Sequence, residues 1–204
     1  MPATTKGERT RARIIGTTAR LMNHHGYLAT PVAEIVAATG IQKGGLYRHF
    51  ESREALLYAA FDFAFAQVRE RFLRAMAGQT GATGQLLAII QAYLPDGLDV
   101  PLPGGCPIMN SAIEADHAHP GLQARARAAM TAWQRLLKRI VAEGIESAEF
   151  RAGIDANEAA SVIVGSLEGG VMLTQLYRHR SHLDAAVRHL TGYIERDLRA
   201  AGRP

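Results

Sequence analysis

The chain has 204 residues, of which 48% are hydrophobic and 21% charged, the balance of an ordinary globular protein with one or two domains. It contains no apolar run long enough to span a bilayer and no secretory signal, so we expect a cytoplasmic protein without membrane attachment. A single cysteine excludes a disulfide framework within the chain. The formal net charge of +4 lies entirely within residues 1–55, where a phosphate-binding surface would need it.

The first helix is expected from about Glu8 to His25, where Gly26 closes it, and residues 1–8 are expected to be disordered. A basic arm accompanies this helix and has two interpretations. It either touches the backbone or minor groove of DNA or remains a solvated tail. The side chains of the arm are Lys6, Arg9, Arg11 and Arg13.

Residues 30–50 predict two short helices joined by a tight turn. Thr30 can cap the first of them, and Gly40 ends it because glycine accepts the left-handed backbone of a sharp exit. The second helix covers about 43–49, with Leu46 on its apolar side. Two short helices with a glycine-containing turn between them are typical of a helix-turn-helix.

The second short helix is suited to approach anions. Gly44 and Gly45 each cost about 1 kcal/mol of helix stability relative to alanine, but they leave a bare backbone that can come close to a phosphate. Several side chains around this helix end carry hydrogen-bond donors: Lys43, Tyr47, Arg48 and His49. We therefore expect this helix to lie in a groove lined by phosphates.

The segment TPVAEIVAATGIQKGGLYRHFESREALL resembles the DNA-binding motif of the TetR (tetracycline repressor) family of transcriptional regulators. The matching features are the threonine before the first helix, the turn with Ala37-x-x-Gly40, Lys43-Gly44, Leu46-Tyr47, His49-Phe50 and Ser52-x-Glu54-x-Leu56. Gln42 and Gly45 depart from the family pattern, which has Ser or Thr and a small Ser, Thr or Ala there, and they leave the start of the helix open. The resemblance implies contacts to double-stranded DNA by Thr30, Gln42, Lys43, Gly44, Gly45, Tyr47, Arg48, His49 and Arg53.

Six more helices are expected, at about 52–77, 84–94, 106–115, 120–147, 155–177 and 181–198. Ser52, the pair Asp155-x-x-Glu158 and the pair Ser181-x-x-Asp184 mark three of their starts. The glycine-rich segment 78–84 is expected to be a flexible turn, and the Pro- and Gly-rich segment 95–105 a loop. No segment alternates with period two, so the predicted fold is all-α.

Nine helices are also the layout of the TetR family, so the resemblance implies two domains. Residues 1–51 would form the helix-turn-helix domain, and residues 52–204 the domain for effector binding and dimerisation. In that family the last two helices pair with a second copy, which the resemblance places here at Gly165, Gly169, Leu183, Val187, Leu190 and Ile194. The alternative for this set is packing within one chain.

Side chains that could line an effector pocket are Phe65, Phe72, Tyr93, Cys106, Met109, Trp133, Met172 and Tyr177. Most members of such a set are normally plain core. No charged side chain stands out among them, which favours an apolar or aromatic effector. Cys106 precedes Pro107 at a predicted helix start, so it is either a reactive sensor or a small buried packing residue.

Other chemistry finds little support in the sequence. Four residues could be read as a metal cluster, but a polar loop between helices explains them better: Glu114, Asp116, His117 and His119. Nucleotide-binding and catalytic motifs are missing, so no metal, cofactor or enzyme activity is expected. The sequence therefore predicts a homodimeric repressor that a small molecule releases from a palindromic operator. The alternative is a helical enzyme or scaffold that carries a helix-turn-helix.

Overall fold

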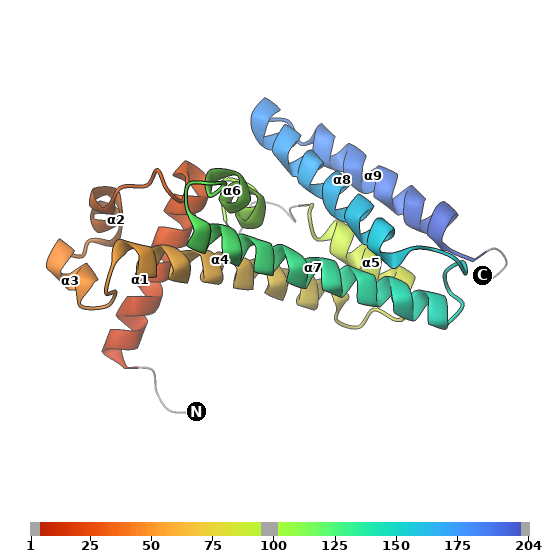
Figure 1. The fold of residues 1–204 in the computed structure, drawn as a ribbon, viewed down its shortest axis with the longest axis horizontal. Helices are drawn as coiled ribbons and strands as arrows, with labels where there is room; N and C mark the ends of the chain where they lie inside the picture. Colours follow the sequence, from red (N-terminus) through yellow and green to blue (C-terminus); the bar gives the residue numbers. More distant parts are fainter. Residues whose placement is uncertain (1–4, 95–101, 201–204) are drawn as a thin grey trace. The chain divides into compact units, whose positions relative to one another are not determined.

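The computed structural model describes residues 5–94 and 102–200, and the long regular elements of this part of the chain are helices (Figure 1). Its elements are α1 (Lys6–His25), α2 (Val32–Thr39), α3 (Lys43–Tyr47), α4 (Arg53–Met76), α5 (Gly81–Gln91), α6 (Pro107–Glu114), α7 (Pro120–Glu146), α8 (Ala156–Tyr177), α9 (Ser181–Tyr193) and the π-helical segment η1 (Ile194–Leu198). One isolated antiparallel bridge joins Phe150 to Arg199. The predicted all-α fold of nine α-helices is confirmed; the π-helical segment was not expected.

The chain divides into two compact units. The first comprises residues 1–68 and 101–127, and the second comprises residues 69–100 and 128–204. Helices α4 and α7 each begin in the first unit and end in the second. The boundary predicted at residue 51 separates roles rather than compact units, and it stays a prediction.

Helix α1 begins two residues before its predicted start because of a capping box. The hydroxyl oxygen of Thr5 accepts the amide of Glu8 at 3.2 Å, and the Glu8 carboxylate accepts the amide of Thr5 at 2.7 Å. These hydrogen bonds with Thr5 hold the pKa of Glu8 below its ordinary value. Residues 5–8 are therefore ordered as the first turn, contrary to the prediction of disorder, while residues 1–4 lie outside the described residues.

Tyr27 occupies the centre of the first unit. Its side chain is fully buried, and its ring meets the edge of Phe61 with centroids 6.0 Å apart. Burial raises the pKa of the Tyr27 phenol, and the neighbouring Cys106 and Glu114 raise it further. The turn between α1 and α2 is therefore anchored in the core.

The starts of α4 and α7 are joined within the first unit by polar contacts. Arg125 of α7 makes two hydrogen bonds to the Asp62 carboxylate, at 2.6 and 2.9 Å, and lies 4.3 Å above the ring of Tyr58. The Tyr58 hydroxyl donates to Glu54 at 2.5 Å, which raises the pKa of Tyr58. Arg125 thus fixes the first part of α7 against α4 by charge and by stacking.

Helix α5 runs from Gly81 to Gln91 rather than over the predicted 84–94. The Glu149 carboxylate accepts the amides of Ala82 and Thr83 at 2.7 and 2.8 Å, so a residue far along the chain caps the first turn. Burial raises the pKa of Glu149, but the hydrogen bonds from Thr83 and Ala82 outweigh it and lower that pKa overall. A cap supplied by the α7–α8 connection could not be read from the local sequence.

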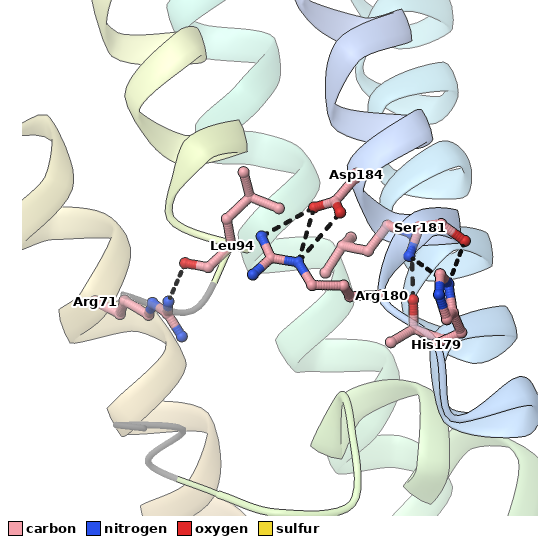
Figure 2. A network of polar contacts seen from close by, with 8 residues as sticks. Arg71, Leu94, His179, Arg180, Ser181 and Asp184 are labelled. Atoms are coloured by element: carbon pink, nitrogen blue, oxygen red, sulfur yellow. Dashed lines mark hydrogen bonds and ion pairs between the residues drawn. The ribbon is translucent and has the colours of Figure 1, made fainter. Parts of the chain in front are cut away.

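Helices α8 and α9 lie side by side in the second unit (Figure 1). Asp155 caps α8 as predicted, because its carboxylate accepts the amides of Asn157 and Glu158. The predicted cap Ser181 is instead the first residue of α9, and Arg180 holds the cap position. The Asp184 carboxylate accepts hydrogen bonds from the Arg180 guanidinium, 3.1 Å away (Figure 2).

Candidate functional site

Helix α3 presents a basic and aromatic face to solvent. Lys43, Tyr47 and Arg48 are exposed, with 41% of Tyr47 accessible, whereas Leu46 is buried and holds the helix on the unit. Residues 43 and 47 lie one helical turn apart, on one side of α3. Ammonium, phenol and guanidinium donors on one exposed surface suit hydrogen bonding to phosphates and base edges.

The two glycines of α3 have different roles. A Cβ atom built on Gly44 would have no neighbour within 4 Å, so this residue offers a bare backbone, as the sequence suggested. A Cβ atom on Gly45 would lie only 2.8 Å from Cγ2 of Ile41. Gly45 therefore allows α3 to pack closely on the preceding turn, and its reason for being glycine is internal.

The residues at the starts of α2 and α3 do not cap these helices with their side chains. Gln42 occupies the N-cap position of α3 but makes no capping hydrogen bond with its exposed side chain. Thr30 is not the cap of α2, since Pro31 holds that position. The Thr30 hydroxyl donates to the carbonyl of Gly26 at 2.6 Å, and its side chain is buried. The cap prediction for Thr30 is corrected, because its hydroxyl closes the α1–α2 turn instead.

Arg53 is directed into the first unit. Its Nη2 atom donates to the carbonyl oxygens of Tyr27, Leu28 and Thr30 at 3.3, 2.9 and 3.0 Å. These are the residues that connect α1 to α2, so the guanidinium of the first residue of α4 holds that connection. These contacts give Arg53 a positioning role that the sequence did not indicate, and its predicted DNA contact stays a prediction.

The basic arm along α1 also has partners inside the unit. Arg13 donates to the carbonyl of Thr39 at 2.7 Å and so satisfies a free carbonyl at the end of α2. The guanidinium of Arg11 lies 4.9 Å from the centroid of the Phe50 ring, within the range of a cation–π contact. Arg11 and Arg13 therefore brace the helix-turn-helix, an explanation that neither of the two expected interpretations included.

Comparison with known families covers both units. Residues 14–60 match the family described as "Bacterial regulatory proteins, tetR family". Residues 82–190, more than half of the chain, match the description "Tetracyclin repressor-like, C-terminal domain". The chain belongs to the TetR family.

Similar proteins extend the TetR match over nearly the whole chain. A TetR transcriptional regulator from Chloroflexus aurantiacus is 41% identical, with a TM-score of 0.91 over 96% of this chain and 99% of that one. A TetR-family regulator from Cytophaga hutchinsonii is 29% identical, with a TM-score of 0.90 over 98% and 100%. The HTH-type transcriptional repressor DhaR from Mycobacterium sp. GP1 is 23% identical, covering 78% of this chain and 79% of its own. The protein is accordingly a DNA-binding transcriptional regulator of the TetR family, as predicted.

Three of the predicted effector-binding residues of this TetR regulator come together in the second unit. The rings of Phe72, Tyr93 and Trp133 are stacked, with centroids 5.5 to 5.8 Å apart and planes inclined by 22 to 27°. They come from α4, from the turn after α5 and from α7. We call Phe72, Tyr93 and Trp133 the aromatic trio.

The other candidates lie elsewhere. Phe65, Cys106 and Met109 belong to the first unit. Met172 and Tyr177 lie on α8 and are largely exposed, so their surroundings are those of a surface rather than a pocket. The sequence could identify apolar side chains but not which of them share a neighbourhood.

Cys106 occupies the N-cap position of α6 and is buried. The described residues just before it are held by hydrogen bonds to α1 and α6. The Asn23 amide donates to the carbonyls of Pro103 and Gly105 at 2.8 and 2.9 Å, and Asn110 donates to that of Gly104 at 2.9 Å. Residues 95–101 of the predicted loop lie outside the described residues. This setting fits the packing interpretation of Cys106, and its sensing role stays untested.

The four residues considered as a metal cluster have other contacts. Glu114 accepts the amide of Leu28 at 3.0 Å, and the His119 ring accepts that of Leu122 at 3.1 Å at the start of α7. Asp116 accepts from Gln123 at 3.3 Å, and His117 is exposed. Within the described part of the chain, no three His, Cys, Asp or Glu side chains are grouped as metal ligands.

The predicted dimer residues separate into two sets. Cβ atoms built on Gly165 and Gly169 would meet nothing within 4 Å, so both glycines face open space on α8. The members of the set on α9 and η1 are buried within one chain: Leu183, Val187, Leu190 and Ile194. They form the side of α9 and η1 that packs inside the second unit, and their part in a dimer interface stays a prediction.

Three exposed side chains that were not expected on this surface continue the line of Gly165 and Gly169. Val162, Met172 and Leu176 are 38%, 46% and 68% exposed. We call these five residues the α8 stripe; their spacing of three, four, three and four residues places them along one side of the helix. Helix α8 is also long and apolar enough to cross a membrane by length and composition, but 44% of its most apolar stretch is buried inside the protein. An apolar outer side explains that composition without a membrane.

Proposed function

We propose that this TetR regulator is a cytoplasmic repressor that binds a palindromic operator as a homodimer and leaves it when a small-molecule effector binds. It has no catalytic activity in this proposal. The observation that carries the proposal is the α8 stripe, an apolar line left uncovered on one chain. The relative from Mycobacterium sp. GP1 that is named a transcriptional repressor agrees with repression as the mode of action.

The α8 stripe has the pattern of a helix-pairing surface. An alternating spacing of three and four residues is the repeat by which two helices pack along their length. Gly165 and Gly169 have open space where a Cβ would be, so a second backbone can approach closely between the apolar side chains of Val162, Met172 and Leu176. Two copies joined by this stripe would be related by a two-fold axis.

A two-fold dimer explains why the operator would be palindromic. Helix α3 has only five residues, so a single copy reads few base pairs. Two copies about 34–36 Å apart would place both α3 helices in successive major-groove turns on one side of the DNA.

The effector acts through the populations of two dimer arrangements: a ligand that prefers the arrangement with the wrong α3 separation reduces the DNA-competent fraction. The aromatic trio supports an effector with apolar or aromatic parts.

Two experiments test the operator: selection of bound DNA from a random pool, and sedimentation of the protein in complex with the selected DNA. The expected result is an inverted repeat bound by two chains, which a member of a chemical library of apolar and aromatic compounds then releases in a gel shift. A selected site without two-fold symmetry, bound by one chain, would overturn the dimer proposal. Operator binding that no compound in the library weakens would count against effector-mediated release.

A further inference from the structure

The ring of His119 lies between the starts of α4 and α7, and 22% of its side chain is accessible. Its Nδ1 atom accepts the amide of Leu122 at 3.1 Å, so it caps the first turn of α7. A ring nitrogen that accepts a hydrogen bond carries no proton, so this contact requires the neutral imidazole with its proton on Nε2. The positive end of the α7 dipole also disfavours a cation at this place.

The other nitrogen of the ring faces α4. Nε2 lies 3.7 Å from Oε1 of Glu54, too far for a hydrogen bond but close enough for two opposite charges to attract. The rings of His119 and Tyr58 are perpendicular, with centroids 5.9 Å apart, and the Tyr58 hydroxyl donates to the same Glu54 oxygen. Glu54 therefore attracts a protonated ring toward α4, whereas the Leu122 amide holds a neutral ring on α7.

The other titratable and charged groups that α4 and α7 bring to this junction have partners of their own. The Asp62 carboxylate of α4 accepts from Arg125 of α7 at 2.6 and 2.9 Å. The hydrogen bond to Glu54 raises the pKa of the Tyr58 phenol, so this group stays neutral in the physiological range. Neither the ion pair nor the phenol changes its charge between about pH 5 and pH 8.

The connection between α6 and α7 adds one carboxylate and a second histidine. Asp116 accepts from Gln123 at 3.3 Å, and its Oδ1 atom lies 3.5 Å from Nε2 of His117. The His117 side chain is 95% accessible, whereas the His119 ring contacts both helices. Histidine is the side chain that ordinarily changes its charge between about pH 5 and pH 8. Protonation of His119 can therefore change how α4 and α7 are joined, and His117 offers a matched control.

Glu54 lies next to the arginine that holds the helix-turn-helix. It follows Arg53, whose Nη2 atom donates to three carbonyls of the α1–α2 connection. A proton on Nδ1 of His119 removes the acceptor of the Leu122 amide and leaves Glu54 as the main attraction on the ring. The ring and the carboxylate then move toward each other, and the first turn of α4 is displaced beside Arg53.

We propose that His119 is a proton-sensitive positioning residue for DNA binding. The neutral ring caps α7, and the protonated ring leaves the Leu122 amide and pairs with Glu54 of α4. The cap is complete above the pH range in which His119 titrates and is lost as the pH falls through that range, while the attraction to Glu54 appears. Acidification therefore displaces the start of α4 and weakens operator binding. This response requires no small-molecule effector and goes beyond the proposed function.

Two asparagine variants separate the proton from the cap. His119→Asn keeps a side chain that accepts the amide of a helix start but takes up no proton, so the cap remains at every pH. His117→Asn is the matched control, because it removes the neighbouring histidine at a left-handed position (φ 55°) that asparagine adopts readily.

The first measurement is NMR of the nitrogen-labelled full-length protein without DNA. At about pH 8 the His119 ring is expected to be the Nε2–H tautomer. The amide resonance of Leu122 should shift with the titration of His119 in the wild-type and His117→Asn proteins. In His119→Asn it should stay in place, because the cap does not titrate.

The second measurement compares operator affinity at about pH 8 and about pH 5.5, at constant ionic strength, with DNA selected from the random pool. The ratio of the two Kd values is compared between variants, since other histidines titrate as well. The ratio of the wild type should exceed that of His119→Asn at least about threefold, and His117→Asn should match the wild type. Glu54→Gln keeps an acceptor for the Tyr58 hydroxyl but removes the charge, so it should lower the ratio as His119→Asn does.

Several outcomes would overturn the inference. They are an Nδ1–H tautomer at about pH 8, a Leu122 amide that does not follow the His119 titration, and equal Kd ratios for wild type and His119→Asn. If His119→Asn does not fold, a Glu54→Gln ratio equal to that of the wild type has the same force. The NMR measurement contains neither DNA nor effector, and the selected DNA need not be palindromic. Failure of this inference is therefore distinguishable from failure of the proposed dimeric, effector-released repressor.

Discussion

The α3 face and the α8 stripe are both exposed on one chain, but they are opposite in chemistry. The α3 face carries Lys43, Tyr47 and Arg48 around a bare glycine, whereas the α8 stripe carries apolar side chains around two glycines. The first suits a polyanion, and its binding should fall steeply with salt because phosphate contacts release counterions. The second suits another apolar helix, and its association should depend little on salt.

Glycine serves these two chemically opposite surfaces in the same way. Gly44 and Gly169 both have open space where a Cβ would be, so each lets another molecule approach the helix backbone. At Gly45 and Gly170, their immediate neighbours, other residues of the same chain occupy the space where a Cβ would be. A Cβ on Gly170 would lie 3.0 Å from Cβ of Ala186. In each glycine pair one residue faces outward and the other allows close packing inside the chain.

The largest expected effect comes from a charge in the α8 stripe. Met172→Asp would bring two carboxylates together and remove water from them, a juxtaposition that costs several kcal/mol. We expect the dimer Kd, measured by analytical ultracentrifugation, to rise at least about a hundredfold, roughly 3 kcal/mol. Ala132→Asp, which adds the same charge at an exposed position of α7, is the control and should leave the Kd unchanged. A dimer that survives Met172→Asp intact would show that the stripe is not the interface.

The second largest effect is expected for Arg53, whose partners lie inside the first unit, in contrast to the residues of the exposed α3 face. Arg53→Ala removes the donor shared by the carbonyls of Tyr27, Leu28 and Thr30, so we expect a loss of about 2–3 kcal/mol in the free energy of unfolding. Urea unfolding measures it. DNA binding should weaken for all sequences in proportion, since the whole helix-turn-helix loosens. An unchanged unfolding midpoint would return Arg53 to the surface role that the sequence suggested.

Arg48→Ala should show the reverse pattern, because Arg48 is exposed on the α3 face. We expect the free energy of unfolding to change by less than about 0.5 kcal/mol. The preference for the selected operator over a variant with one altered base pair should fall by about 1–3 kcal/mol if Arg48 reaches a guanine edge. Competition gel shifts measure this difference, and an Arg48→Ala protein with unaltered base preference would remove Arg48 from base readout.

Tyr47→Phe is expected to have the smallest effect. Removing one hydroxyl from the exposed face should weaken DNA binding by about 0.5–1.5 kcal/mol, equally for all sequences, if its partner is a phosphate. Dimerisation should not change, since Tyr47 lies in the first unit and the α8 stripe in the second. A loss confined to one base pair would indicate that Tyr47 reads sequence instead.

Local patterns predicted the helices well but not the partners of their side chains. The apolar spacing of Leu183, Val187 and Leu190 correctly placed them on one side of α9. Periodicity shows which residues share a side, but it does not show whether the covering helix belongs to the same chain or to a second one. The true outward line on α8 was readable as a three- and four-residue spacing around Gly165 and Gly169.

Long-range polar contacts were the second feature that could not be predicted from the sequence. The cap of α5 comes from Glu149 and the closure of the α1–α2 turn from Arg53, and no local pattern announces a partner that distant. Glu168 left a weak signal, since an acidic residue in an otherwise apolar helix suggests a specific contact. Its place beside the Tyr93 hydroxyl of the aromatic trio, 3.4 Å away, required the fold.

The three carbonyls held by Arg53 also have a mechanical consequence. Arg53 connects the first residue of α4 to the α1–α2 connection. A displacement along α4 would therefore move the whole helix-turn-helix and not α3 alone. With Arg13 fastening the end of α2 to α1, the three N-terminal helices should swing as a rigid lever arm. A small displacement at the start of α4 would then be magnified at Tyr47 without any bending within the three N-terminal helices.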